Sequence, residues 1–185
     1  MMPQPATPPV LSIRWMIRPD LPAVLAISEE SFHMPWTRDQ FLAVLRHRNT
    51  IGLVATDPHG IIGFMIYELF KSHVTILNLA VHPWFRRQTC GSQMIRLLVR
   101  RARQAHRECV GTVICEDNLP GQLFLKANGF RATGIENGVY PGGLAGAVVA
   151  AELVAQPQVG AQVLVGGLAP HARPGPVVVL VLGID

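Results

Sequence analysis

A segment near the middle of the chain has the residue types and spacing of an anion-binding turn. It reads HPWFRRQTCGS over residues 82–92, and the apolar, β-branched run before it, VTILNLAV, is typical of a buried strand. Apolar and basic residues follow at helical spacing, so the turn should open a helix. First-turn amides lack intrahelical partners and the helix dipole adds positive potential, so the pattern predicts a phosphate site made of main-chain donors.

Periodicity and end signals predict the elements on both sides of this turn. Asp20 stands as a candidate N-cap, Thr37-Arg-Asp-Gln40 fits a capping box, and DPHG at 57–60 indicates a hairpin turn. The predicted strands cover 12–18, 53–56, 61–69, 74–81, 109–115, a segment starting at 130, and 147–153. The predicted helices cover 21–32, the residues after the capping box, 91–107 and 120–128. This order predicts an α/β fold whose mixed, mostly antiparallel central sheet is flanked by helices on both faces.

Length and composition favour one compact domain. A chain of 185 residues can bury a sizeable core, and its 49% hydrophobic content includes no apolar run near the roughly 18 residues of a membrane span. We expect a flexible leader at 1–12, the folded domain at 13–155 and a low-complexity Ala/Val/Gly/Pro tail at 156–185. The leader lacks the marks of a signal peptide, so we expect a cytoplasmic protein without membrane contact.

Charge and cysteine usage narrow the classes of partner. Three cysteines without a C-x-x-C pair argue against a disulfide framework and against a zinc site, so no metal is expected. The net charge of +4 favours anionic partners such as a phosphorylated cofactor, ribosomal material or nucleic acid, without choosing among them.

With these motifs in order, the chain resembles the GNAT family of acyl-CoA N-acyltransferases. The diphosphate loop of that family has the pattern (Gln/Arg)-x-x-Gly-x-(Gly/Ala), which here reads Arg86-Arg-Gln-Thr89-Cys-Gly91. The segments LNLAVHPWFRRQ and EDNLPGQLFLKANGF, within a resemblance that spans 13–153, are most similar to the bacterial ribosomal-protein-alanine N-acetyltransferases. The resemblance implies acetyl-CoA as the donor and a protein N-terminal α-amine as the acceptor, with a ribosomal protein as one candidate.

The same resemblance assigns roles to individual residues. It implies that the cofactor lies against the main chain of one strand, the loop and an asparagine that opens the next helix: Leu79, Ala80, Val81, Arg86, Arg87, Gln88, Thr89, Cys90, Gly91, Ser92 and Asn118. An exposed amide of that strand can stabilise the thioester oxyanion. The acceptor is expected beside Met34, Pro35, Trp36 and Tyr140.

Three positions depart from the family pattern. Thr89 replaces the first loop glycine; its Cβ intrudes on the diphosphate, and a positive φ there would add strain of about 1–3 kcal/mol. Val113 stands where this branch has a glutamate base, five residues before Asn118. Leu125 stands where it has a tyrosine that protonates the thiolate, seven residues after Asn118.

Other side chains could supply part of the missing chemistry. Glu116 could act as a base through a water, although a carboxylate near a helix N-terminus is also favoured by the dipole alone. His82 is a second candidate, with a plain loop residue before Pro83 as the alternative, and Tyr140 is a third.

The residues therefore allow three classes of function. The first is an N-acetyltransferase with reduced chemistry, and the second is an acyl-CoA-binding pseudoenzyme that senses or scaffolds. The third is a basic module for RNA or ribosome, carried by Arg96, Arg100, Arg101, Arg103 and Arg107. It ranks last, because the chain lacks the aromatic platform on which single strands stack, so direct nucleic-acid binding is not expected.

Overall fold

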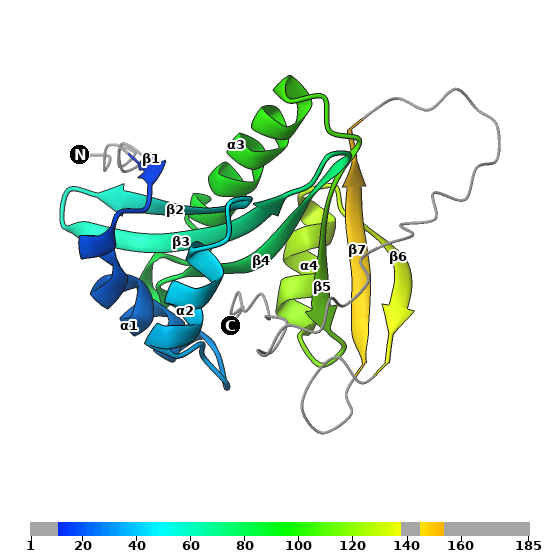
Figure 1. Cartoon of the computed structure of the whole chain (residues 1–185). Coiled ribbons are helices and arrows are strands. Elements are labelled where there is room, and N and C mark those ends of the chain that lie inside the picture. Colours follow the sequence, from blue (N-terminus) through cyan, green and yellow to red (C-terminus); the bar gives the residue numbers. More distant parts are fainter. Residues whose placement is uncertain (1–10, 138–144, 154–185) are drawn as a thin grey trace, which may run out of the picture.

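The structure is a computed structural model that describes residues 11–137 and 145–153. Most of the expected leader, the tail expected at 156–185 and Tyr140 lie outside the described residues. The described strands form one sheet in the order β1-β2-β3-β4-β5-β7-β6 (Figure 1). Their bounds are β1 Ser12–Trp15, β2 Thr50–Asp57, β3 Gly60–Leu69, β4 His73–Val81, β5 Cys109–Cys115, β6 Arg131–Glu136 and β7 Gly146–Glu152.

Helices cover both faces of this sheet. Their bounds are α1 Leu21–Ser31, α2 Arg38–Leu45, α3 Cys90–Gln104 and α4 Leu119–Ala127, with short 3-10 turns at Arg18–Asp20 and Pro83–Phe85. The mixed, mostly antiparallel sheet with helices on both faces confirms the predicted fold class. No helix in the described part of the chain is both long and apolar enough to cross a bilayer.

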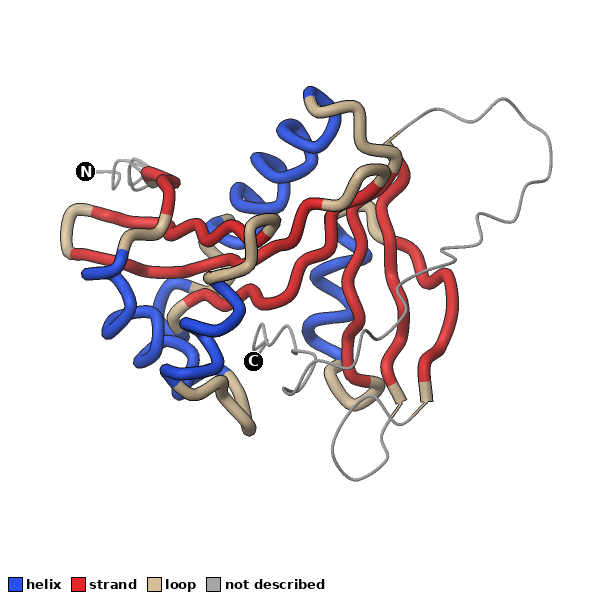
Figure 2. The backbone as a smooth tube through the Cα atoms, in the orientation of Figure 1, coloured by secondary structure: helices blue, strands red, loops and turns tan. Residues whose placement is uncertain are grey.

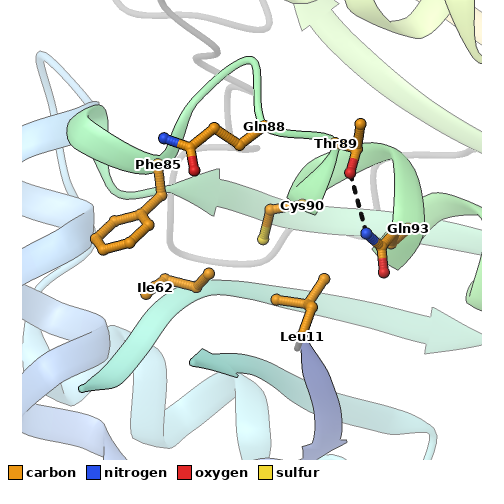
Figure 3. Close-up of a pocket in the computed structure, with 7 residues that line it drawn as sticks. All are labelled: Leu11, Ile62, Phe85, Gln88, Thr89, Cys90 and Gln93. Atoms are coloured by element: carbon orange, nitrogen blue, oxygen red, sulfur yellow. Dashed lines mark hydrogen bonds between the residues drawn. The ribbon is translucent and has the colours of Figure 1, made fainter. Parts of the chain in front are cut away.

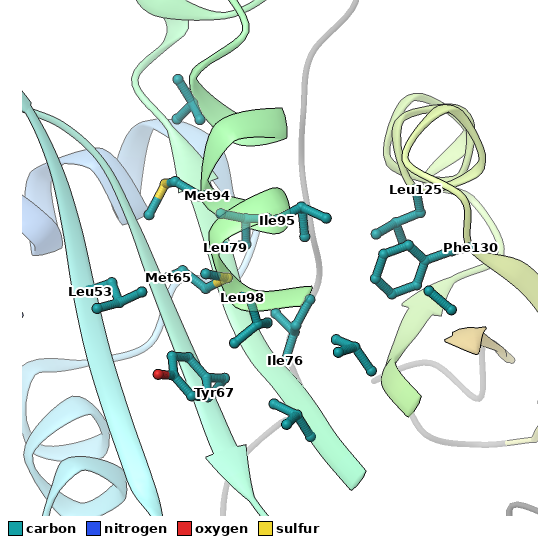
Figure 4. Close-up of a cluster of buried hydrophobic side chains, with 14 of the residues drawn as sticks. Leu53, Met65, Tyr67, Ile76, Leu79, Met94, Ile95, Leu98, Leu125 and Phe130 are labelled. Carbon is teal, nitrogen blue, oxygen red and sulfur yellow. The ribbon is translucent and has the colours of Figure 1, made fainter. Parts of the chain in front are cut away.

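Each sheet face carries its own apolar core. In Figure 4, Met94 and Leu98 of α3 pack against Met65 and Leu79 of the sheet, and Leu125 extends this core below α4. The opposite core lies below α1 and α2. There Phe41 is fully buried, with its ring edge-to-face against Trp36 at 5.2 Å and against Phe64 at 5.7 Å. The two cores fix α3 on one side of β4 and α1 on the other.

One pair of neighbouring strands separates along its length. β4 and β5 run parallel and pair only through His73, Val74 and Thr75 with Cys109, Val110 and Gly111. Beyond Thr75 the two strands diverge, as the tubes in Figure 2 show. We call the space between their diverging ends the β4–β5 opening.

Local end signals in the sequence proved accurate. Thr37 and Gln40 form the predicted capping box, in which the Gln40 amide donates to Thr37 Oγ1 (3.3 Å) and the Thr37 amide donates to Gln40 Oε1 (2.8 Å). In the DPHG turn, Asp57 Oδ1 accepts from the amide of Gly60 at 2.9 Å. Gly129 follows α4 with a φ of +88°, the left-handed conformation expected of a helix end.

The prediction that Asp20 caps α1 was wrong. Asp20 occupies the N-cap position, but its side chain makes no cap hydrogen bond. Its carboxylate instead accepts from the Arg14 guanidinium at 2.6 and 2.8 Å and from the Ile17 amide at 2.8 Å. A charged donor on β1 wins over the helix amides because a two-pronged Arg–carboxylate contact is stronger than a single neutral one. Asp20 therefore ties β1 to the start of α1.

Replacing Asp20 with asparagine is expected to lower the free energy of unfolding at neutral pH by about 1–3 kcal/mol, since it weakens hydrogen bonds to a buried charge. The Arg14 hydrogen bond lowers the pKa of Asp20 in the folded state. Its stabilisation is therefore present above the ordinary aspartate pKa and is lost as the pH falls through the folded value. Urea unfolding should show a gap between wild type and variant at neutral pH that narrows in acid.

The exposed Glu29 of α1 provides the control for this prediction. Glu29→Gln should change the unfolding free energy little. A gap between wild type and Asp20→Asn that is equally wide at both pH values would contradict the assignment.

Candidate functional site

The main chain of β4 presents hydrogen-bonding groups to the β4–β5 opening. The His82 amide donates to Ile62 of β3 at 2.8 Å, and in an antiparallel ladder alternate residues point to opposite neighbours. Leu79 and Val81 therefore point toward the opening. The Val81 carbonyl accepts from Arg86 Nε at 3.0 Å, which leaves its amide as a donor. The geometry suits the predicted role of this strand in holding an extended arm and an oxyanion.

A side chain of β5 closes the narrow end of the opening. Thr112 Oγ1 donates to the Ile76 carbonyl at 2.9 Å, directly after the last β4–β5 residue pair. Thr112 was not among the predicted site residues, although a polar residue inside the apolar strand CVGTVIC indicates a position with a specific contact. The bond fixes where the two strands begin to part.

The predicted anion-binding loop forms the start of α3. Thr89 occupies the N-cap position with φ 67° and ψ −4°, the left-handed conformation expected where glycine would normally stand. Within the described chain, the amides of Cys90, Gly91 and Ser92 donate no hydrogen bond to another residue, and the first helical amide with a partner is that of Gln93, which donates to the Thr89 carbonyl (2.9 Å). Three amides at one helix end form a site for an anion.

A cavity of about 310 Å³ lies against this loop. Its walls come from the end of β4, the loop, the first turn of α3 and the outer side of α4: Val81, Phe85, Arg86, Arg87, Thr89, Cys90, Gly91, Ser92, Leu123, Phe124 and Ala127. A Cβ at Gly91 would lie 3.2 Å from Phe124 Cζ, so any larger residue there would require the Phe124 ring to shift by a few tenths of an ångström. The loop amides therefore border an open space that the loop's own side chains leave unfilled.

Most polar side chains of the loop make contacts inside the protein. Arg86 reaches back to Ser31 Oγ of α1 (3.0 Å), and Gln88 Nε2 donates to the Trp84 carbonyl (3.0 Å). Thr89 Oγ1 accepts from Gln93 Nε2 at 3.0 Å, the dashed line in Figure 3. These side chains brace the loop, so its main chain supplies the donors for an anion.

Cys90 borders a second, smaller cavity besides the large one. It lines a pocket of about 20 Å³ together with Leu11, Ile62 and Phe85 (Figure 3). The side chain is buried, and burial raises the pKa of the Cys90 thiol to about 12. A neutral, enclosed thiol is no nucleophile, so the Cys90 side chain has a packing role.

Asn118 and Glu116 flank the start of α4. Asn118 is 8% exposed; its Oδ1 accepts from the Gly121 amide (3.0 Å), while its Nδ2 has no partner within the described residues. This nitrogen could donate a hydrogen bond to a ligand. The assignment of Asn118 to the cofactor therefore stays a prediction, and Nδ2 is the atom that could make the contact. Glu116 Oε1 accepts from the Ala145 amide at 3.0 Å, which links the end of β5 to the start of β7.

The two positions without proton-transfer groups lie in different surroundings. Val113 is 6% exposed and, by alternation with Val110 and Ile114, faces the sheet side that carries α1 and α2. Leu125 is fully buried in the core below α4, as Figure 4 shows. Neither can move a proton.

The remaining candidates surround the end of α1. Trp36 is buried and Met34 is 54% exposed. Of these two side chains, Met34 is therefore the one that an acceptor could contact. His82 caps the turn at Pro83–Phe85 by accepting from the Trp84 amide (3.4 Å), and its Nε2 lies 3.3 Å from Glu30 Oε2. Tyr140 lies outside the described residues.

The chain is similar in sequence to proteins of one known family. The family model of the "Acetyltransferase (GNAT) family" matches residues 12–130. A Bacillus subtilis protein provisionally named a ribosomal protein bS18-alanine N-acetyltransferase is 25% identical over 130 residues, which cover 70% of this chain and 86% of that protein.

Solved structures repeat the fold. The Escherichia coli ribosomal-protein-S18-alanine N-acetyltransferase matches with a TM-score of 0.72 and 19% identity, over 80% of this chain and 97% of that one. Arabidopsis thaliana NAA60, solved in complex with acetyl-CoA, matches with a TM-score of 0.69 and 17% identity, over 78% of this chain and 99% of that one. The family match spans more than half of the 185 residues and the fold agrees with it, so the chain belongs to the GNAT family of acetyltransferases.

Proposed function

We propose that this chain moves an acetyl group from acetyl-CoA to the N-terminal α-amine of a protein, with a ribosomal protein as the leading acceptor. The observation that carries the proposal is a set of three amides at the start of α3 that donate to no described residue and border the cavity of about 310 Å³. A diphosphate fits such donors. Similarity to proteins named for ribosomal protein acetylation supports the choice of acceptor. A cytoplasmic location belongs to the same proposal.

The β4–β5 opening provides the place where the groups would react. The main chain of Leu79 and Val81 would hold the thioester arm, and a β4 amide would stabilise the oxyanion that forms when the amine attacks the carbonyl carbon. The carbon–nitrogen bond forms, the carbon–sulfur bond breaks, and the thiolate leaves with one proton. Holding amine and thioester together contributes several kcal/mol to catalysis without any side chain.

A second candidate function is acyl-CoA binding without turnover. The observation that favours it is the apolar pair Val113 and Leu125, because general acids and bases each contribute about 10²- to 10⁴-fold to a rate. On this alternative the protein would sense or scaffold an acyl-CoA.

Calorimetry with acetyl-CoA, followed by mass spectrometry of Ala-starting peptides, separates the candidates. A peptide with a blocked N-terminus and an internal lysine is the control for α-amine selectivity. Binding with transfer supports the acetyltransferase, and binding without transfer supports the pseudoenzyme. If millimolar acetyl-CoA does not bind, both functions are rejected.

Replacing Thr89 with glycine is expected to stabilise the fold by about 1 kcal/mol and to tighten acetyl-CoA binding severalfold. Left-handed backbone costs an L-residue about 1–2 kcal/mol, of which glycine's larger folding entropy offsets part. Removal of the Cβ also lets phosphate oxygens approach the amides. Thr89→Ser keeps the Cβ and the hydroxyl and is the matched control. Calorimetry that ranks the serine and glycine variants equally would show that the side chain does not limit the site.

A further inference from the structure

A row of polar side chains, three of them buried, crosses the sheet next to the β4–β5 opening. Thr50 of β2, Glu68 of β3 and Thr75 of β4 lie directly opposite one another in the strand register, and Asn78 follows on β4. Glu68 is 5% exposed, Thr75 8% and Asn78 1%. We call these four residues the polar row.

The polar row lies on the sheet face that carries α1 and α2. Phe64 and Ile66 belong to the core on that face, and alternation along β3 places Glu68 with them. Thr75 lies opposite Glu68 and Asn78 opposite Ile66, and cross-strand partners share a face. The row is thus on the side opposite α3, whose N-terminus borders the proposed cofactor cavity.

Four atoms of the row have no hydrogen-bond partner within the described residues: Thr50 Oγ1, Thr75 Oγ1, Asn78 Oδ1 and Asn78 Nδ2. Buried polar atoms in proteins are nearly always paired, because desolvation without a partner costs about 1–3 kcal/mol for each group. Several unpartnered polar atoms near the Glu68 carboxylate indicate a site where water or a polar group of a substrate supplies the missing hydrogen bonds.

The row reaches the β4–β5 opening at its narrow end. Thr75 pairs with Gly111 of β5, in the last residue pair before the strands part, and Val113 lies two residues further along β5 on the same face. Asn78 precedes Leu79, whose main chain points into the opening. An acceptor amine that enters from this face would reach the row and the thioester carbonyl together.

We propose that Glu68 is the carboxylate that receives the acceptor's proton, through water held by Thr75 and Asn78, in place of the side chain missing at Val113. This inference rests on the proposed function. The acceptor ammonium gives one proton to the Glu68 carboxylate, and the neutral amine forms the carbon–nitrogen bond as the carbon–sulfur bond breaks. The leaving thiolate takes one of the two protons that the nitrogen loses, and the other passes to solvent.

The groups around Glu68 are compatible with this role. His73 of β4 is the titratable neighbour whose charge interacts with Glu68, and burial lowers its pKa while Glu108 and Glu68 act in the opposite direction. On α1, which packs on β3, Glu29 and Glu30 are exposed.

Glu68→Gln tests the proposal, because glutamine keeps the size and accepts hydrogen bonds but takes no proton. We expect kcat to fall about a hundredfold at roughly pH 6.5 and less than tenfold at roughly pH 9, where an α-amine of pKa about 7.7–8.0 is already neutral. The Kd for acetyl-CoA should not change. The exposed Glu29→Gln is the matched control.

Two further variants separate proton transfer from packing. Thr75→Val keeps the shape and should lower kcat with the same pH dependence, and Val113→Glu added to Glu68→Gln should restore at least a tenth of the wild-type rate. A loss that is equal at both pH values, or a Glu68→Gln variant as fast as wild type, would overturn the inference while leaving acetyl transfer intact. A wild-type protein without transfer would instead reject the proposed function.

Discussion

Replacing Ser92 with glutamate is expected to weaken acetyl-CoA binding roughly a hundredfold or more while making the free protein slightly more stable. Ser92 lies in the first turn of α3 and lines the 310 Å³ cavity. A carboxylate there adds a like charge beside the diphosphate, and two unit charges at about 4 Å repel by about 4 kcal/mol near a protein surface. The same carboxylate interacts favourably with the helix dipole, by about 0.3–1 kcal/mol.

The opposite signs of these two effects make the experiment decisive. Calorimetry measures the Kd and thermal unfolding measures stability on the same samples. Ser92→Gln, which has the same size without the charge, should bind far better than the glutamate variant. If both variants bind acetyl-CoA equally, the anion does not lie at the start of α3, and the proposed function loses its main support.

Replacing Val113 with glutamate is expected to raise kcat for an Ala-starting peptide about a hundredfold, the lower end of the range for a general base. Val113 lies two residues beyond the last β4–β5 pair, on the same sheet face as the polar row, so we expect a carboxylate there to lie closer to the proposed amine than Glu68 does. Val113→Gln should give no increase, because it has the same shape without a base.

Leu125 is the less suitable position for a restored side chain. It is fully buried among core residues, and a tyrosine there would overpack the core at a cost of about 1–3 kcal/mol. The test therefore changes Val113 alone. Steady-state rates at saturating acetyl-CoA give the result, and equal rates for wild type and both Val113 variants would show that proton removal does not limit the reaction at this position.

Features that depend on neighbouring residues in the sequence were predictable. The capping box at Thr37 and the DPHG turn each need only a few consecutive residues to form, and both were confirmed. The loop pattern also pointed to Thr89 as a place where a positive φ would add strain, and Thr89 does have a left-handed backbone.

Features that depend on tertiary contacts were not predictable in the same way. Asp20 bonds to Arg14 on another element, and Arg86 turns inward to Ser31, which is 55 residues away. The polar row needs the exact register of β2, β3 and β4, including the irregularity between Ile66 and Tyr67. Alternation along one strand gives a side chain's face but not the residue it meets on the next strand.

The short pairing between β4 and β5 has a kinetic consequence. Because only three residue pairs join the two strands, the β4 main chain beyond Thr75 has no main-chain partner on β5 within the described residues and can hold a donor directly. In the proposed reaction the donor stays in place while the acceptor attacks it, and the enclosed Cys90 offers no alternative route through an acylated enzyme. The expected initial-rate pattern is that of a ternary complex, with intersecting double-reciprocal lines in place of the parallel lines of a ping-pong reaction.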